Sequence, residues 1–448
     1  MLKNKNIRPG LTGTQIIAIS FAAMIAAGTF LLSLPAASRS GEASSVLDCF
    51  FTATSASCVT GLSVYDTYTH WSLFGQLVIL LLIQAGGLGL MTLFTIASIF
   101  LKKRISIHER KMLMESAGTM RMSGVVLLLK KIFKGTLLFE GLGALLLSFR
   151  FCGEFGLKKG LYFAVFHSVS AFCNAGFDLF GAKGSPSLTS YSNDPLVMLT
   201  VSFLIIIGGL GFHVWNDVQK KRFKFSEYEL HTKIVLSSSA LLLLLGMAWF
   251  FFAEKNYSMA GMSFGERLLS SFFASVTPRT AGFYGINYSL ASKASLLVSM
   301  FLMFIGGSPC STAGGIKTTT FAVMLFAVLS NAKADNDVVV YKRRISESVM
   351  KQAGSIATVY LLAVFAAGVA LCFAENFSTE AVFFEVISAA GTVGMSLGIT
   401  SELCAFSKIV LSVLMFGGRI GMLSLTVLFR YNTKPAPVRR PEEKILVG

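Results

Sequence analysis

Long apolar stretches alternate with shorter, more polar ones along the whole chain. There are eight apolar stretches, each long enough to cross a hydrocarbon layer of about 30 Å as a helix. They are Ile16–Leu34, Leu73–Leu101, Val125–Phe149, Pro195–Val218, Ile234–Ala253, Ser295–Ser330, Ile356–Ala374 and Lys408–Tyr431. Between the two members of each successive pair lies a segment too short to cross, which we expect to form a re-entrant loop shielded by protein or a water-filled cavity. The pattern predicts an all-α integral membrane protein with eight crossing helices and four re-entrant loops.

The same phrase returns in each re-entrant segment: a Phe, then small and hydroxylated residues, then a Gly ten positions after the Phe. The copies are Phe51–Gly61, Phe166–Gly176, Phe272–Gly282 and Phe384–Gly394. Four copies at near-regular spacing indicate a repeat protein. We expect the repeats to cover residues 1–104, 105–222, 223–335 and 336–431, each with a helix, a pore loop and a second helix, followed by a cytoplasmic tail over 432–448. The first pore helix is expected near Val46–Ser57.

The repeated glycines indicate a chemistry, because glycine takes positive φ at little steric cost and lets a carbonyl point where another residue would resist. Four such turns around one axis would present rings of carbonyl oxygens, which is how potassium filters replace the hydration shell of the ion. The alternative is that the glycines form four tight turns between helices. That interpretation would be the better one for a single copy, but four copies in register favour the filter. The expected filter consists of Val59, Thr60, Gly61, Asn174, Ala175, Gly176, Thr280, Ala281, Gly282, Thr392, Val393 and Gly394.

Each inner span carries a glycine pair, and the third span carries more. The pairs are Gly86-Gly87, Gly208-Gly209, Gly306-Gly307 and Gly417-Gly418, a pattern typical of close helix packing in membranes. In the third span, proline, further glycines and hydroxyls interrupt the helix, so we expect residues 305–320 to form a polar loop that gates the pore. A kinked helix whose Ser and Thr groups satisfy the backbone is the alternative. The expected gate residues are Gly306, Gly307, Ser308, Pro309, Ser311, Thr312, Ala313, Gly314, Gly315, Lys317 and Arg419.

Arg419 lies at mid-span in the last apolar stretch, where a charge is a functional hypothesis by default. If the repeats surround one pore, Arg419 faces the same cavity as the loop. It could hold the loop through hydrogen bonds to carbonyls, or act as an electrostatic barrier to a cation. The sequence leaves both roles open.

Composition agrees with the membrane assignment. The chain of 448 residues is 54% hydrophobic and only 14% charged, with a mean hydropathy of +0.67. Its net charge of +16 is concentrated in the loops and tails that lie on one side if each repeat crosses twice, which the positive-inside rule makes cytoplasmic. The charge is therefore not a sign of nucleic acid binding. The seven cysteines lack the spacing of a disulfide framework or a zinc site.

The ordered motifs resemble the membrane subunits of the Trk/Ktr/HKT potassium transporter superfamily. The resemblance covers nearly the whole chain, through Cys-Val-Thr-Gly-Leu62, Phe-Cys-Asn-Ala-Gly-Phe177, Thr-Pro-Arg-Thr-Ala-Gly-Phe283, Gly-Thr-Val-Gly-Met395 and the Gly-Gly-Ser-Pro-x-Ser-Thr-Ala-Gly-Gly-Ile-Lys-Thr run ending at Thr318. The length, without an additional amino-terminal helix pair, looks more like the bacterial Ktr branch.

The resemblance implies a pseudo-four-fold pore in each subunit of a homodimer in a bacterial inner membrane, with both termini cytoplasmic. It also implies a gating loop and a cytoplasmic ring of nucleotide-binding regulatory subunits of the RCK type. A glycine at all four filter positions goes with potassium in this family, so the resemblance places potassium at Gly61, Gly176, Gly282 and Gly394. It leaves open whether sodium is a coupling or activating ion. No covalent cofactor is expected.

Two other function classes remain. Gly394–Gly398 matches the GxSxG motif of a membrane hydrolase, but that motif needs a strand-to-helix turn with His and acidic partners, so we expect no enzyme. A sodium-coupled carrier with alternating access would show inverted repeats, whereas these repeats all enter from the same side. The sequence thus favours potassium uptake through a gated pore, with the carrier as the alternative.

Overall fold

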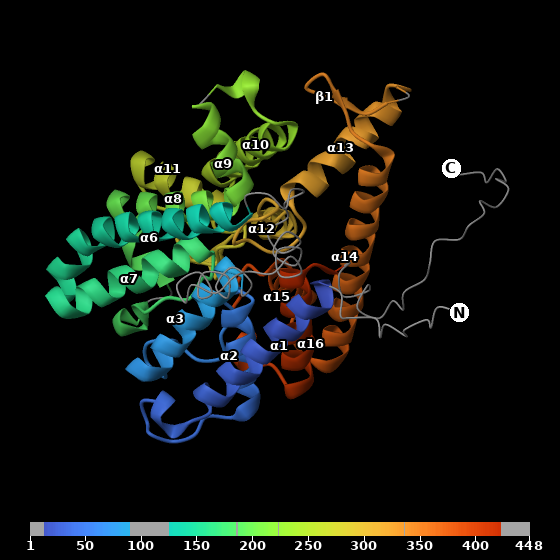
Figure 1. Ribbon diagram of the computed structural model, residues 1–448. Coiled ribbons are helices and arrows are strands. Elements are labelled where there is room, and N and C mark those ends of the chain that lie inside the picture. The colour runs from blue at the N-terminus through green and yellow to red at the C-terminus, as the bar shows by residue number, and fades with distance from the viewer. Residues whose placement is uncertain (1–12, 90–124, 185–186, 223, 336, 423–448) are drawn as a thin grey trace, which may run out of the picture.

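The computed structural model describes residues 13–89, 125–184, 187–222, 224–335 and 337–422, and these residues are mostly helical (Figure 1). The outer helices are α1 (Gly13–Leu32), α6 (Val125–Phe155), α10 (Leu230–Ala253) and α14 (Glu347–Ala374). The pore helices are α2 (Val46–Ser57), α7 (Leu157–Cys173), α11 (Phe264–Val276) and α15 (Thr379–Gly391). The inner helices are α3 (Leu73–Leu88), α8 (Pro195–Leu210), α12 (Lys293–Phe304) followed by α13 (Thr318–Ala332), and α16 (Ala405–Ile420).

Smaller elements connect these helices. Helix α9 (Phe212–Lys221) follows α8, and an antiparallel hairpin of β1 (Val339–Val340) and β2 (Arg343–Arg344) separates α13 from α14. Short 3-10 turns cover Pro35–Ala37, Phe180–Lys183, Ser187–Tyr191, Phe225–Glu227, Tyr288–Leu290 and Thr400–Glu402. Several sequence predictions lie outside the described residues: the repeat boundaries at 104 and 431, the tail over 432–448, and the ends of the spans over 90–101 and 423–431.

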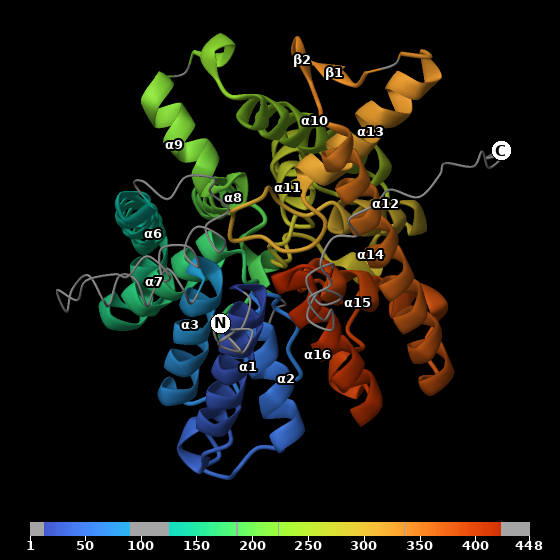
Figure 2. The same cartoon turned by 45° about the vertical axis from the view of Figure 1, so that its right-hand side comes forward.

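Each repeat contributes an outer helix, a pore helix and an inner helix, as the sequence predicts, and the four repeats surround a common centre (Figure 2). The inner helix of one repeat packs against the pore helix of the next: α3 against α7, α8 against α11, α12 against α15, and α16 against α2. The last of these contacts joins the fourth repeat to the first, so the ring is closed.

A buried ion pair reinforces that closure. Lys408 Nζ, in the first turn of α16, lies 2.7 Å from Asp48 Oδ1 in the first turn of α2. The second carboxylate oxygen of Asp48 accepts a hydrogen bond of 2.7 Å from the hydroxyl of Tyr65. Both charged side chains are about nine-tenths buried, with 11% of each exposed. Since a buried charge is stable only when it is paired, the two residues hold the first and fourth repeats together.

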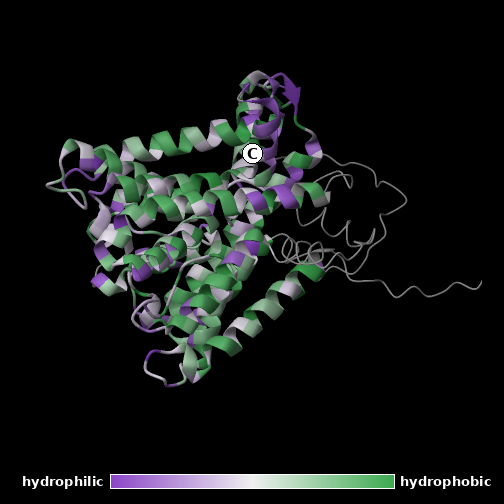
Figure 3. Ribbon diagram, turned by 60° about the vertical axis from the view of Figure 1, so that its left-hand side comes forward, coloured by the Kyte–Doolittle hydropathy of each residue, from purple (hydrophilic) through white to green (hydrophobic). Residues whose placement is uncertain are grey.

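The helices consist mostly of apolar residues (Figure 3), and many large apolar side chains on them are exposed. Phe252 on α10 is 77% exposed and Phe373 on α14 is 95% exposed, an arrangement that suits lipid rather than water. Four described helices are long and apolar enough to span a membrane alone. The inner helices are shorter, because glycines or a break end them near the centre of the molecule. The protein is a multi-pass membrane protein.

The prediction of a continuous inner span from Pro195 to Val218 is wrong. Helix α8 ends at Leu210, and α9 leaves it at an angle of 93°. The bend lies at Gly211, whose φ is +93° and which has Pro309 O 2.5 Å from the place where a side-chain carbon would be. Only glycine fits both the backbone angle and the space. The predicted interruption of the third inner span is confirmed, since residues 305–317 separate α12 from α13.

Candidate functional site: a four-strand filter, a loop beneath it and a vestibule above

Four short strands meet where the pore helices end, and their glycines close a ring. A side-chain carbon placed on Gly61 would lie 2.6 Å from Ala175 O, and one placed on Gly176 would lie 2.8 Å from Ala281 O. On Gly282 it would meet Val393 O, and on Gly394 it would meet Thr60 O, both closer still. Each glycine therefore faces the carbonyl before the next glycine, in cyclic order. The ring leaves no room for a side chain at any of the four positions.

The four strands share one backbone pattern. Their glycines have positive φ, from +69° at Gly176 to +100° at Gly61. The residue two positions before each glycine also has positive φ: 58° at Val59, 59° at Asn174, 71° at Thr280 and 51° at Thr392. A left-handed backbone costs a residue other than glycine about 1 to 3 kcal/mol and persists only where its surroundings impose it. The sequence analysis includes these four residues in the expected filter but does not predict their left-handed backbone, which is unexpected because three of them are β-branched.

A hydroxyl residue at the end of each pore helix supports the strand that follows. In the first repeat, Ser55 O accepts from Thr60 N at 2.8 Å and Ser55 Oγ accepts from Gly61 N at 3.0 Å. Ser388 makes the same two contacts in the fourth repeat, at 2.8 Å to Val393 N and 3.1 Å to Gly394 N. The strands are thus held by direct hydrogen bonds from their own pore helices.

The second and third repeats use the hydroxyl differently. Ser170 Oγ donates to Phe177 O at 2.7 Å, and Thr277 Oγ1 donates to Phe283 O at 2.6 Å. Phe177 and Phe283, which carry these carbonyls, directly follow the filter glycines of their repeats. In these two repeats the hydroxyl therefore fixes the outer end of the strand instead of its glycine.

The third copy of the repeated phrase is one residue shorter than the others in the structure. Thr277 lies five residues before Gly282, whereas Ser55, Ser170 and Ser388 lie six residues before their glycines. Phe273, which is completely buried, consequently takes the place of Phe51, Phe166 and Phe384, and the partly buried Phe272 does not. Counting ten residues back from the glycine is therefore wrong in this copy.

The inner-helix glycines allow close packing against the pore helices, as the sequence predicts. Gly86 lies against Ser57 O, Gly208 against Phe172 O, and Gly418 against Ala390 O. Each of these carbonyls belongs to the end of a pore helix, so a side chain at the glycine would push that helix away. In the third repeat the equivalent Gly306 packs against Gly314 O, which belongs to the loop.

The loop over residues 305–317 runs beneath the filter and touches the other repeats through backbone hydrogen bonds. Ser308 N donates to Gly209 O at 3.0 Å, and Thr312 N donates to Gly208 O at 3.3 Å, both in the second repeat. Gly315 N donates to Gly418 O at 3.3 Å in the fourth repeat. The loop closes on itself as well, since Gly306 N donates to Ile316 O at 2.8 Å and Thr318 N to Gly307 O at 3.0 Å.

Two cationic side chains hold this loop through carbonyl oxygens. Arg419 donates from Nη1 to Thr312 O and from Nη2 to Gly86 O, and its Nη2 lies 3.1 Å from Gly87 O. It therefore links the fourth inner helix, the loop and the first inner helix. Lys317 Nζ donates to Ala313 O at 2.7 Å, next to the carbonyl that Arg419 uses. This geometry supplies the tether that the sequence left open, and it also places positive charge below the filter.

The elbow between α8 and α9 is a further contact of the loop that sequence reasoning missed. Phe212 N donates to Cys310 O at 2.9 Å, and Gly211 lies against Pro309 O. On its other side, Asp217 of α9 accepts from Glu229 N at 2.9 Å at the start of the third repeat. The loop and the segment that begins the third repeat are therefore joined through α9.

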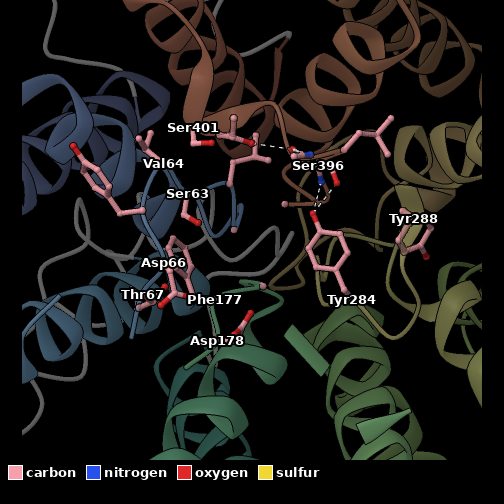
Figure 4. Close-up of a pocket in the computed structure, with 18 of the residues that line it drawn as sticks. Ser63, Val64, Asp66, Thr67, Phe177, Asp178, Tyr284, Tyr288, Ser396 and Ser401 are labelled. Atoms are coloured by element: carbon pink, nitrogen blue, oxygen red, sulfur yellow. Dashed lines mark hydrogen bonds between the residues drawn. The ribbon is translucent and has the colours of Figure 1, made fainter. Parts of the chain in front are cut away.

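A cavity of about 460 Å³ lies on the opposite side of the filter from the loop, with Gly61, Gly176 and Gly394 among the residues that line it (Figure 4). The residue two positions after each filter glycine also lines this vestibule: Ser63, Asp178, Tyr284 and Ser396. Asp178 and Asp66 make its wall acidic. The pore helices end at the strands, and the negative ends of their dipoles favour a cation there. The chemistry of the site is that of a path for a cation.

The structure brings all the predicted site residues to this centre. The twelve predicted filter residues lie in the four strands, and the predicted gate residues lie in the loop or, for Arg419, on the helix that touches it. Their roles as a filter and a gate stay a prediction. Among the described residues no group of three His, Cys, Asp or Glu side chains is arranged to hold a metal ion.

Comparison with known proteins gives consistent matches. The family model TrkH, described as a cation transport protein, matches residues 5–436. The chain is 40% identical to the potassium/sodium uptake protein NtpJ of Enterococcus hirae, with all of both chains covered. It is 38% identical to the Ktr system potassium uptake protein B of Bacillus subtilis, with 98% of this chain and 97% of the other covered. The crystal structure of the potassium transporter TrkH from Vibrio parahaemolyticus has the same fold, with a TM-score of 0.74 at 18% identity over 96% of this chain and 87% of that one.

Proposed function

Because the chain belongs to the TrkH family of cation transport proteins, we propose that it takes up potassium across the cell membrane through the pore at the centre of its four repeats. The observation that carries this proposal is the closed ring of four glycine strands. Carbonyl oxygens in such a ring replace the water around an ion, and the pore helices add negative potential. The ion is the substrate, and no covalent cofactor is needed.

Potassium is favoured over sodium by two considerations. Glycine stands at all four ring positions, so no hydroxyl side chain narrows the ring at Gly61, Gly176, Gly282 or Gly394. Two relatives that match nearly the whole chain are named as potassium uptake proteins. The name of the NtpJ relative includes sodium, and that observation keeps a second candidate: a carrier in which sodium is a coupling or activating ion.

The loop over residues 305–317 is proposed as the gate, with Arg419 as its latch. In the described arrangement it crosses beneath the ring and is fastened to the second and fourth repeats, and Arg419 connects it to the first repeat. An ion leaving the filter would meet glycines and hydroxyls held by two cations. Release of the loop from Arg419 would open the path. The gate thus combines a tether with an electrostatic barrier.

The protein is proposed to work as a homodimer in a bacterial inner membrane, with both termini cytoplasmic. A cytoplasmic ring of nucleotide-binding subunits of the RCK type would regulate it, as the naming of the relatives as parts of a Ktr system suggests. Exposed basic residues form a surface that these regulatory subunits could bind. They are Lys220 near the end of α9, and Arg343 and Arg344 on β2. By the positive-inside rule this surface is cytoplasmic.

Uptake of radioactive rubidium into proteoliposomes that contain the purified protein tests the proposal, with potassium, sodium and lithium as competitors. Potassium should compete far better than sodium. Gly61→Ser should let sodium compete much better, because a hydroxyl and a Cβ would enter the ring. The matched control is Gly41→Ser, since Gly41 also has positive φ, +74°, but has open space around it. Unchanged selectivity in Gly61→Ser would remove the assignment of the filter, and strictly coupled uptake of sodium with potassium would favour the carrier.

A further inference from the structure

A carboxyl group is completely buried behind the fourth filter strand. Glu385 lies on α15, three residues before Ser388, and none of its surface is exposed. Its Oε1 accepts a hydrogen bond from the hydroxyl of Thr400, while its Oε2 has no hydrogen-bond partner among the described residues. A carboxyl group so deeply buried is costly unless its hydrogen bonds compensate for the lost hydration, so the contacts of Glu385 suggest a role that an apolar side chain could not fill.

The contacts of Glu385 lead to the rim of the filter. The hydroxyl oxygens of Thr400 and Ser396 lie 3.0 Å apart, and Ser396 is two residues beyond Gly394. Glu385 therefore fixes Thr400, and Thr400 fixes the side chain of Ser396. Since Ser388 holds Gly394 N from the other side, the fourth strand is fastened at both of its ends.

A tyrosine of the neighbouring repeat completes the connection. Tyr284 Oη donates to Ser396 O at 3.0 Å and accepts from Ser396 N at 2.5 Å (Figure 4). Tyr284 is itself two residues beyond Gly282 in the third strand. The rim network of Glu385, Thr400, Ser396 and Tyr284 thus ties the third and fourth strands together at the vestibule.

The second repeat has a comparable arrangement at the same helix position. His167 lies three residues before Ser170 on its pore helix, as Glu385 does before Ser388, and is likewise completely buried. Its Nδ1 lies 2.7 Å from Phe163 O, and its Nε2 accepts from Leu179 N at 3.1 Å, just beyond the second filter strand. A buried polar side chain at this position thus supports the segment after the filter in two different repeats by two different chemistries.

We propose that Glu385 is a positioning residue for cation selection, which acts through the rim network on the fourth filter strand. The proposal rests on the proposed potassium pore. Selection between two cations depends on where the carbonyl oxygens are held and how firmly, whichever of the two properties dominates. Glu385 acts on this geometry as a hydrogen-bond acceptor and does not touch the ion. Removing the acceptor should therefore loosen the fourth strand and weaken discrimination against sodium.

The experiment measures the concentrations of sodium and of potassium that halve rubidium uptake into proteoliposomes, and takes their ratio. Thr400→Val and Tyr284→Phe keep the shape of the side chains and remove one hydroxyl each. Both should lower the ratio by roughly 3- to 10-fold, which corresponds to the loss of one ordinary net hydrogen bond. Glu385→Met should lower it at least as far, whereas Glu385→Gln, which keeps an acceptor, and Thr400→Ser should stay near the wild-type ratio.

The control is Thr358→Val, the same change at an exposed threonine on α14 that bonds only within its own helix. An unchanged ratio in both Thr400→Val and Tyr284→Phe would overturn the inference, even if Glu385→Met failed to fold. A ratio lowered as much by Glu385→Gln as by Glu385→Met would show that the charge acts, and not the acceptor. Lower uptake with an unchanged ratio would indicate a purely structural role. If sodium competes with rubidium as well as potassium does in the wild-type protein, the potassium pore itself fails.

Discussion

Alanine substitutions at the four ring glycines should differ in severity, and the structure ranks them. Gly176 is the most tolerant position, because its φ of +69° lies within the left-handed region and its added carbon would be 2.8 Å from Ala281 O. Gly394 is the least tolerant. Its φ is +93°, and the added carbon would meet Thr60 O as well as Gly61 Cα at 2.8 Å and Gly61 C at 3.1 Å.

The size of the effect follows from these contacts. Real Cβ contacts are essentially never shorter than 3.0 Å, so alanine at position 176 would displace Ala281 O by at least about 0.2 Å and would press on Gly282 Cα at 3.2 Å. Alanine at position 394 has two atoms below that limit, Thr60 O and Gly61 Cα, and must move more of the backbone of the first strand. Left-handed strain adds about 1 to 3 kcal/mol at either site. We expect Gly176→Ala to change the ratio of sodium to potassium competition by a few-fold, and Gly394→Ala to abolish discrimination or uptake.

Rubidium uptake with sodium and potassium competition, measured on all four variants at equal protein content, checks this ranking. Gly41→Ala is the control for strain alone, since Gly41 has a φ of +74° and nothing within 4 Å of the added carbon. The reasoning is refuted if Gly176→Ala is as damaging as Gly394→Ala, or if Gly394→Ala retains wild-type selectivity in a folded protein.

Three further predictions concern the surroundings of the ring. Deleting residues Ser311 to Gly315 should raise unregulated rubidium flux through a folded protein, because the deletion removes the carbonyl that Arg419 binds; wild-type flux would show that the loop is not a gate. Asp178→Asn should raise the rubidium concentration for half-maximal uptake by roughly 3- to 10-fold at low ionic strength and by less in high salt, since screening weakens the attraction of the vestibule; a shift that ignores ionic strength would contradict this. Lys408→Met should destabilise the protein by about 3 kcal/mol, because Asp48 would be left buried and unpaired, and a melting curve in detergent would show it; Asp48→Asn with Lys408→Met should recover part of the loss.

The sequence predicts the repeats well because the same features recur at long and nearly regular intervals along the chain. The apolar spans and the recurring glycines indicate four units, and the first pore helix begins and ends at the residues expected. The residues predicted for the filter and the gate also lie near one another, because all of them except Arg419 lie at marked breaks in the apolar stretches. The sequence could not predict which residues form hydrogen bonds and packing contacts with one another across the repeats.

Single residues explain the misses. Gly211 follows a glycine pair in an apolar run, and the sequence analysis interprets that pair only as a packing motif. A further positive-φ glycine ends the inner helix here, as Gly89 and Gly421 do in the first and fourth repeats. The missing residue in the third copy is hidden because Phe272 and Phe273 are adjacent and either satisfies the pattern. The positive φ of Val59 is imposed by its surroundings against its own preference, and no local signal announces it.

The closed ring of four strands also constrains how the protein assembles in the membrane. Each strand of the ring packs against the strand of the next repeat, and the fourth packs against the first. Asp48 and Lys408, 360 positions apart in the chain, join the helices of the same two repeats. Until the final helix has entered the membrane, the first pore helix lacks its neighbour and the carbonyls of the first strand have no finished ring to join. Contacts between such distant parts of a chain form late. A nascent chain that carries three repeats therefore lacks the closed ring of four strands, which is completed only when the last repeat docks onto the first.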